Sequence, residues 1–178
     1  MKRAAAFFIC LYTLTASYAQ NYQPVDAKSS VKFTIKNFGI NTGGSFKGLE
    51  GSIVFDKANP EKAVFDISIS TTTVNTDNDA RDNHLRKEEY FDAARFPKIS
   101  FKSEKVSAKG SGFTVTGQLS IKGTSKTVSI PFKATPGAEG ILFEGSFQLN
   151  RRDYKVGGNS MVLGDNVTVT LSVQAAKK

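Results

Sequence analysis

The sequence is almost without the residues that build covalent cross-links and transition-metal sites. It has one cysteine, Cys10, and one histidine, His84, in 178 residues. A disulfide needs two cysteines, and a transition-metal site usually takes several Cys or His ligands. Cys10 also lies in an N-terminal segment that we expect to be removed. The mature chain is therefore expected to have no disulfide, zinc–thiolate site, covalently attached haem or catalytic cysteine.

Long hydrophobic runs are lacking as well, since no stretch approaches the roughly 20 apolar residues of a membrane-spanning helix. One shorter run, residues 4–16, follows a positively charged start and precedes a small-x-small sequence that ends at Ala19. This order is typical of a secretory signal peptide. We therefore expect residues 1–19 to be removed. Residues 20–178 would then form one domain of a periplasmic or secreted protein.

Acidic residues are outnumbered by basic ones, with 16 Asp and Glu against 24 Lys and Arg and a formal net charge of +8. Removal of the N-terminal segment, which has two basic residues and no acid, lowers this charge to +6. The basic residues are scattered, and an exported protein rarely meets nucleic acid, so we expect no nucleic-acid partner. A solvated surface is the simplest interpretation. A phosphate-bearing ligand or transient contact with anionic lipid head groups stays open, and the oligomeric state is not predicted.

The dominant pattern is an alternation of apolar and polar residues with a period of two. Successive side chains of a β-strand point to opposite faces, so such segments have one apolar and one polar face. The apolar positions are Val31, Phe33 and Ile35; Ile53 and Phe55; Phe65, Ile67 and Ile69; Ile99 and Phe101; Phe113, Val115, Leu119 and Ile121; Val128, Ile130 and Phe132; Ile141, Phe143, Phe147 and Leu149; and Val167, Val169, Leu171 and Val173. Turns that contain glycine or proline separate the groups. The pattern predicts an all-β, antiparallel domain of about eight strands.

Periodicity alone does not distinguish a closed barrel from a β-sandwich. The composition adds one observation about the interior of the domain. The chain has 14 phenylalanines and no tryptophan, and most of these phenylalanines stand at the inward-facing positions of long strands. Such rings either line a cavity inside a barrel or fill a solid core. The residues by themselves leave both arrangements open.

One segment interrupts the alternation: residues 76–97, TDNDARDNHLRKEEYFDAARFP. Residues 77–79 are of types that cap helices well, and no glycine or proline follows them until Pro97. This composition predicts one or two short helices around residues 78–94. We expect them to lie across one end of the β domain.

Catalysis and metal binding find little support in this segment. A catalytic role for His84 needs a nucleophile and a carboxylate beside it, and no nucleophile-elbow sequence is present. An EF-hand loop starting at Asp77 fails, because Arg81 and Asp82 stand where a ligand and a glycine are needed. We expect the protein to be no enzyme, to hold no metal and to require no cofactor.

Three stretches of the sequence, read together, carry a family resemblance over about Tyr22 to Ala175. The most specific combines Thr76, Arg81-Asp82-Asn83-His84-Leu85, Phe91-Asp92, Phe96-Pro97 and Ser100-Phe101. The others are GSFKGLEGSIVFD at residues 44–56 and GQLSIKGTSK at residues 117–126. These motifs resemble the YceI-like family of exported lipid- and polyisoprenoid-binding proteins. The chain departs from the family at Asn37, where relatives often have His, and at Lys155, where they often have Gly.

The resemblance implies a lipocalin-like, eight-stranded antiparallel barrel with a short helical segment beside it. It also implies an elongated apolar interior that holds a long isoprenoid chain, so that the protein would be a carrier with a bound polyisoprenoid or isoprenoid quinone. This favours a cavity over a solid core. The alternative is a ligand-free structural or stress-related interaction domain with a solid β core.

On this hypothesis, inward side chains of the strands line the channel for the ligand. They are Phe33, Ile35, Phe55, Phe65, Ile67, Phe101, Phe113, Val115, Ile130, Phe132, Phe143 and Phe147. We expect Arg81, His84 and Arg86 near its mouth, where they stabilise the helical segment or meet a polar head group.

Overall fold

The computed structural model describes residues 20–178, so the predicted signal peptide lies outside the described residues. The strands are β1 (Gln20–Pro24), β2 (Ser30–Asn37), β3 (Ile40–Phe55), β4 (Val64–Asn75), β5 (Lys98–Lys109), β6 (Gly112–Ile121), β7 (Thr124–Gly137), β8 (Gly140–Asn150) and β9 (Leu163–Lys177). The helices between them are α1 (Asp79–Leu85) and the short 3₁₀ helices η1 (Asp26–Lys28), η2 (Pro60–Lys62) and η3 (Arg151–Tyr154).

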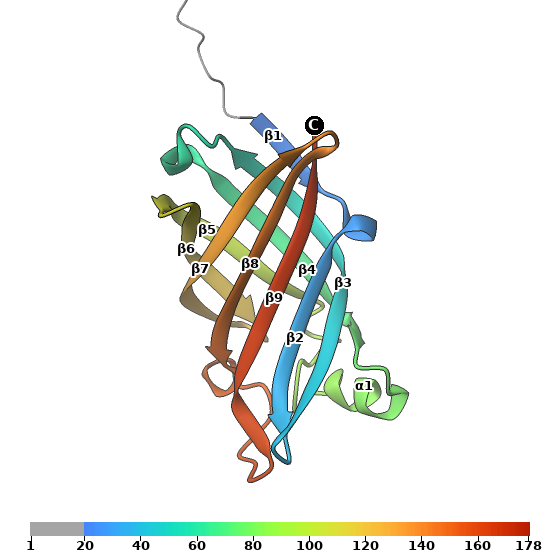
Figure 1. Cartoon of the computed structure of the whole chain (residues 1–178). Helices are drawn as coiled ribbons and strands as arrows, with labels where there is room; N and C mark the ends of the chain where they lie inside the picture. The colour runs from blue at the N-terminus through green and yellow to red at the C-terminus, as the bar shows by residue number, and fades with distance from the viewer. Residues whose placement is uncertain (1–19) are drawn as a thin grey trace, which may run out of the picture.

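The strands form one closed antiparallel barrel (Figure 1). Around it the order is β3-β2-β9-β8-β7-β6-β5-β4, and pairing between β4 and β3 completes the ring. β1 takes the place of β2 at one end, because it pairs with β3 at Phe55 and with β9 at Ala175. β1 and β2 thus act as a single strand interrupted by η1. The predicted eight-stranded barrel is confirmed, and the sandwich is excluded.

The alternation of the sequence matches the two faces of the barrel wall. Along β6, every second residue is buried from Phe113 to Ile121, and the residues between them are half-buried on the outer face. The pleat of the strand turns one set of side chains inward and the other toward water. Inward apolar positions from all the strands therefore meet in one core.

A cluster of phenylalanine rings fills the barrel at the end where β1 pairs with β3. We call it the aromatic cluster; its members are Phe55, Phe65, Phe113, Phe132 and Phe143. The ring of Phe55 lies edge-on to those of Phe113 and Phe143, with centroids 5.3 Å apart in both pairs. Edge-to-face rings at this spacing are in favourable contact. This end of the core is solid.

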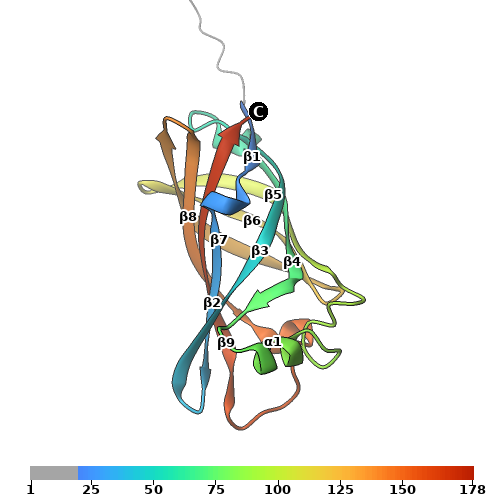
Figure 2. The same cartoon turned by 90° about the vertical axis from the view of Figure 1, so that its right-hand side faces the viewer.

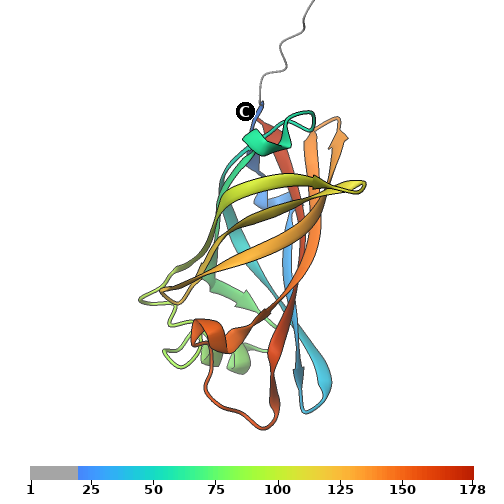
Figure 3. The same cartoon turned by 90° about the vertical axis from the view of Figure 1, so that its left-hand side faces the viewer.

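At the opposite end, two pairs of neighbouring strands separate. β4 pairs with β5 only over Asp66–Ser70, and β7 pairs with β8 only beyond Phe132. Residues 76–97, which include α1, lie beside the first gap, and η3 lies at the second (Figures 2 and 3). The two closing segments are joined by a hydrogen bond of 2.9 Å from the Gly157 N–H to the Glu89 carbonyl. We call this the α1 end.

The predicted helical segment is one α-helix followed by turns. Asn78 caps α1, because its side-chain oxygen accepts a hydrogen bond of 2.9 Å from the Arg81 N–H. The helix ends at Leu85, and Asp92 has a φ of 48°, which a right-handed helix does not allow. The prediction of one or two short helices around residues 78–94 is confirmed by one α-helix, Asp79–Leu85, and the residues after it form turns.

Candidate ligand cavity

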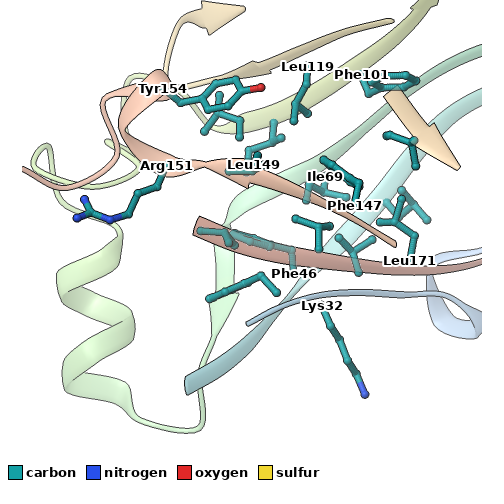
Figure 4. Close-up of a pocket in the computed structure, with 18 of the residues that line it drawn as sticks. Lys32, Phe46, Ile69, Phe101, Leu119, Phe147, Leu149, Arg151, Tyr154 and Leu171 are labelled. Atoms are coloured by element: carbon teal, nitrogen blue, oxygen red, sulfur yellow. The ribbon is translucent and has the colours of Figure 1, made fainter. Parts of the chain in front are cut away.

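An apolar cavity of about 260 Å³ occupies the barrel between the aromatic cluster and the α1 end (Figure 4). Every strand from β2 to β9 contributes apolar side chains to its wall. The segment after β4 adds Leu85, Tyr90 and Phe91. Three members of the aromatic cluster form its closed end. The core is thus solid at one end and hollow over the rest of its length.

The cavity reaches the surface at the α1 end. Its lining residues there include Asn37, Thr42, Arg81 and Leu163, all of which are half-buried. We call these four residues the mouth. They bring amide, hydroxyl and guanidinium groups to the entrance of an otherwise apolar channel, which suits a ligand with a long apolar chain and a polar end.

Most of the predicted channel residues line this cavity. The ten that do so are Phe33, Ile35, Phe65, Ile67, Phe101, Val115, Ile130, Phe132, Phe143 and Phe147. Phe55 and Phe113 lie elsewhere, in the aromatic cluster, where they are 1% and 7% exposed and pack against other rings. Their inward parity is correct, but parity does not tell a residue at a solid end from one beside the void.

Sequence reasoning missed several lining residues of β3, because the alternation is broken there. Phe46 and Leu49 both line the cavity although they are three positions apart. Between Ser45 and Glu50 the pairing of β3 with β4 shifts register twice, and Gly48 has a φ of 74°. A β-bulge inserts an extra residue and so exchanges the two faces of the strand. The only signal in the sequence was the glycine-rich stretch itself.

Arg81 is the one predicted mouth residue that lines the cavity. Its Nε donates to the Thr76 Oγ1 at 2.8 Å, and its Nη2 donates to the Thr76 carbonyl at 2.7 Å. The buried carboxylate of Asp82 accepts from the N–H of the same threonine at 2.9 Å and from its hydroxyl at 2.5 Å. Arg81 is thus fixed beside the mouth by a network within its own segment.

His84 and Arg86 do not line the cavity. The His84 ring lies 4.9 Å from the Tyr90 ring, and its Nε2 is 3.8 Å from a Glu89 carboxylate oxygen. Arg86 donates to the carbonyls of Thr72 and Val74 at 2.8 and 3.0 Å, on the part of β4 that has left β5. Both side chains hold the α1 segment in place. Of the two roles expected for them, this is stabilisation of the helical segment and not contact with a polar head group.

Arg151, which the motif analysis did not assign to the site, is the centre of a second network. The residue is 3% exposed. Its guanidinium donates to the carbonyls of Val156, Gly157, Gly158, Leu163 and Gly164 and to the carboxylate of Asp165. These bonds fold residues 156–165 against η3 and leave the guanidinium fully engaged. Figure 4 shows it pointing away from the lining side chains.

Tyr154, also in η3, lines the cavity and is 2% exposed. Among residues 20–178, its hydroxyl and that of Thr114 are the buried side-chain oxygens without a hydrogen-bond partner. Burial, and to a lesser degree the charge of Asp153, raises the pKa of Tyr154 to about 12. The hydroxyl therefore stays protonated and neutral at physiological pH.

The described part of the chain contains no cluster of His, Cys, Asp and Glu that would hold a metal ion. No helix among residues 20–178 is long and apolar enough to cross a bilayer. The chemistry that this site offers is apolar contact along its length, with a few polar groups at the mouth and one inside.

The comparison with known families decides the relationship. The profile of the YceI-like domain matches residues 22–175. The chain belongs to the YceI-like family. It is 28% identical over 177 residues to the UPF0312 protein YE1254 of Yersinia enterocolitica, a match that covers 94% of this chain and 92% of that protein.

Two solved structures superpose on this barrel over most of its length. BcnA of Burkholderia cenocepacia is 25% identical and superposes with a TM-score of 0.81, over 86% of this chain and 99% of that one. A polyisoprenoid-binding domain from Saccharophagus degradans, implicated in plant cell wall breakdown, is 16% identical with a TM-score of 0.67. That match covers 90% of this chain and 100% of the domain, and at this identity it shows a shared fold.

Proposed function

We propose that this YceI-like protein is an exported, non-enzymatic carrier that holds a long-chain isoprenoid or related lipid in the barrel. The observation that carries the proposal is the apolar cavity between the aromatic cluster and the mouth, with a wall built by every strand from β2 to β9. The shared fold of the polyisoprenoid-binding domain from Saccharophagus degradans supports the same ligand class. A polyisoprenoid or an isoprenoid quinone suits this channel.

The energetics of such binding are favourable. Burial of one CH₂ group contributes about 0.8 kcal/mol, so a five-carbon isoprene unit contributes roughly 3–4 kcal/mol. A few units therefore exceed the association cost of about 4–15 kcal/mol. The cavity volume of about 260 Å³ is near the lower end of ligand sites, which run from about 300 to 1,000 Å³. A thin, flexible isoprenoid chain suits this space.

The apolar surface beside the mouth supports transient contact with a membrane. We call it the apolar tip; it consists of Phe38, Ile40, Met161 and Val162. Phe38 is 73% exposed, Ile40 is 71% exposed, and Met161 is fully exposed. The Phe38 N–H donates to the Val162 carbonyl at 2.8 Å, so the β2–β3 turn and the loop before β9 lie side by side. Figure 1 shows both at the lower end of the barrel.

We propose a lipid bilayer as the occupant of this tip. Its members lie close in sequence to the mouth residues Asn37 and Leu163, so the tip lies beside the entrance of the cavity. The proposed cargo dissolves in membranes and not in water, and it must cross between the two without exposure. The positive net charge of the mature chain favours an anionic lipid surface.

Ligand extraction is the first test of the carrier function. Protein purified from its host should release a polyprenyl compound on extraction with organic solvent, seen by mass spectrometry at close to one per chain. Empty protein should take up phytanol, a branched C20 alcohol, and Leu171→Trp on β9 should block uptake by filling the cavity. Ile40→Trp, outside the cavity, is the matched control. Repeated empty extracts together with no uptake would support the ligand-free structural domain instead.

Vesicle sedimentation tests the membrane contact. The protein should bind vesicles of phosphatidylcholine with about 30% phosphatidylglycerol, and the Phe38→Ser/Met161→Ser double variant should lose most of this binding. Val64→Ser is the control, because Val64 is 44% exposed at the opposite end of the barrel. Binding that is equal in wild type and double variant, or a wild-type dimer that the double variant abolishes, would contradict the proposal. Export is tested separately: the secreted protein should begin at Gln20.

A further inference from the structure

Tyr154 is held in the cavity wall by the turn that carries it. The side chain of Asn150 caps η3 by accepting a hydrogen bond of 2.9 Å from the Arg152 N–H. Arg151 binds the carbonyls of the loop that follows, and Lys155 ends the turn with a left-handed backbone. The phenol ring between these anchors has a defined place and does not need its own hydroxyl to be positioned.

The hydroxyl is unusual because nothing in the described residues satisfies it. A buried tyrosine hydroxyl usually has a hydrogen-bond partner, and an unpaired buried polar group costs about 1–3 kcal/mol. A phenylalanine would fill the same space without this cost. The other unpaired hydroxyl, that of Thr114, has the parity of the outer face of β6, because its neighbours Phe113 and Val115 are the buried ones.

The surroundings of the hydroxyl are apolar. In Figure 4 the Tyr154 ring lies among the lining side chains with its oxygen on the side of Leu119 and Leu149, whereas Lys32 and Arg151 point away from the cavity. The hydroxyl is closed off from bulk water, and the residue that carries it lines the channel. Among the described residues, it is the one buried side-chain oxygen without a partner whose residue lines the cavity.

We infer that the Tyr154 hydroxyl is a binding site for an oxygen atom of the ligand, and that the cargo is an oxygenated apolar chain rather than a pure hydrocarbon. This inference rests on the proposed carrier function. The phenol is neutral at physiological pH, so it donates a hydrogen bond to a carbonyl, ether or alcohol oxygen. The neighbouring guanidinium of Arg151 is not available to a phosphate, because carbonyls and Asp165 already engage it. A quinone or alcohol therefore fits better.

The test compares three probes on wild type and Tyr154→Phe. The probes are phytane, a saturated C20 hydrocarbon; phytanol, the alcohol of the same branched type; and menaquinone-4, an isoprenoid quinone. Tyr154→Phe should weaken binding of at least one oxygenated probe roughly tenfold and leave the affinity for phytane unchanged. Tyr22→Phe is the matched control, because Tyr22 lies outside the cavity wall and its hydroxyl donates to Gln20; it should leave all three affinities unchanged.

The thermal stability of the empty protein separates a ligand contact from a structural role. Tyr154→Phe removes no hydrogen bond from the empty protein, so its Tm should be equal to that of wild type or higher. A lower Tm, or an equal loss of affinity for phytane and the oxygenated probes, would overturn the inference. So would unchanged affinities for all three probes. If wild type binds none of them, the carrier function itself fails, and the two failures are thereby distinguished.

Discussion

Tyr154 and its neighbour Lys155 both occupy positions that cost folding free energy. Tyr154 buries an unpaired hydroxyl, and Lys155 has a φ of 57°, in the left-handed region that a side chain with a β-carbon disfavours. The two residues lie next to Arg151, whose many hydrogen bonds hold the turn together. Local strain of this kind persists where the surrounding structure over-determines the conformation.

The ionisation of Tyr154 should make stability depend on alkaline pH. Its pKa is 10.0 in an unfolded chain and about 12 in the folded protein. The resulting stabilisation is complete below pH 10 and is lost as the pH rises through 12. At pH 11, relative to pH 8, wild type should lose about 1 kcal/mol more of its unfolding free energy than Tyr154→Phe. Urea unfolding at both pH values measures this, and equal losses would refute it.

The backbone of Lys155 predicts a stabilising substitution. Glycine adopts a positive φ without the steric cost that a β-carbon brings. Lys155→Gly should therefore raise the unfolding free energy by about 0.5–1 kcal/mol. Lys155→Ala removes the same charge but keeps the β-carbon, so it should give no such gain. A gain of equal size in both variants would locate the effect in the lysine charge instead of the backbone.

At the scale of elements, the segment between β4 and β5 was predicted only in part: its helix was expected from the sequence, and the turns after the helix were not. Its capping residues and its polar composition predicted a short helix in the right place. The turns after Leu85 were not predictable from composition, because Tyr90 and Phe91 leave the helical path to pack against the cavity. Tertiary contact overrides local helix preference there.

The Thr76–Asp82 network should be the main support of this segment. Asp82→Ala leaves the N–H and hydroxyl of Thr76 without their acceptor in a buried site. The unfolding free energy should fall by about 2–3 kcal/mol, and hydrogen exchange should accelerate in residues 76–97. Glu88→Ala, an exposed acid of the same segment, should change it by less than about 0.5 kcal/mol. Similar losses in both variants would point to segment charge rather than this network.

The strands show where pattern reasoning stops. The alternating groups of β4 to β9 are found where the sequence placed them, because one face of each strand is buried and the other is wet. The bulges of β3 between Ser45 and Glu50 and the interruption between β1 and β2 were missed. These irregularities depend on how neighbouring strands curve around the barrel. The apolar–polar pattern of a single strand does not predict this curvature.

At the scale of the whole molecule, barrel closure and the extent of the cavity lay beyond periodicity. The same alternation serves a sandwich, and the family resemblance was needed to favour the barrel. The solid end was hidden as well, since Phe55 and Phe113 have the same parity as the rings that line the void. Long-range packing decides which inward residues touch each other and which face empty space.

A bound cargo should stabilise the whole barrel, because it binds only the folded state. With phytanol at about 100 times its dissociation constant, the gain is about 2.7 kcal/mol. For a domain of this size, that raises Tm by about 5–10 °C. Leu171→Trp, which fills the cavity, should show no shift at the same concentration. A shift of equal size in that variant would mean that phytanol binds outside the barrel.

The aromatic cluster closes the barrel channel at one end. A chain-shaped ligand that enters by the mouth must also leave by the mouth, so the end of the ligand that enters first leaves last. Its orientation is then set once, on arrival, and cannot reverse inside. The membrane or protein that donates the ligand and the one that accepts it would therefore have to bind at the same mouth, one after the other.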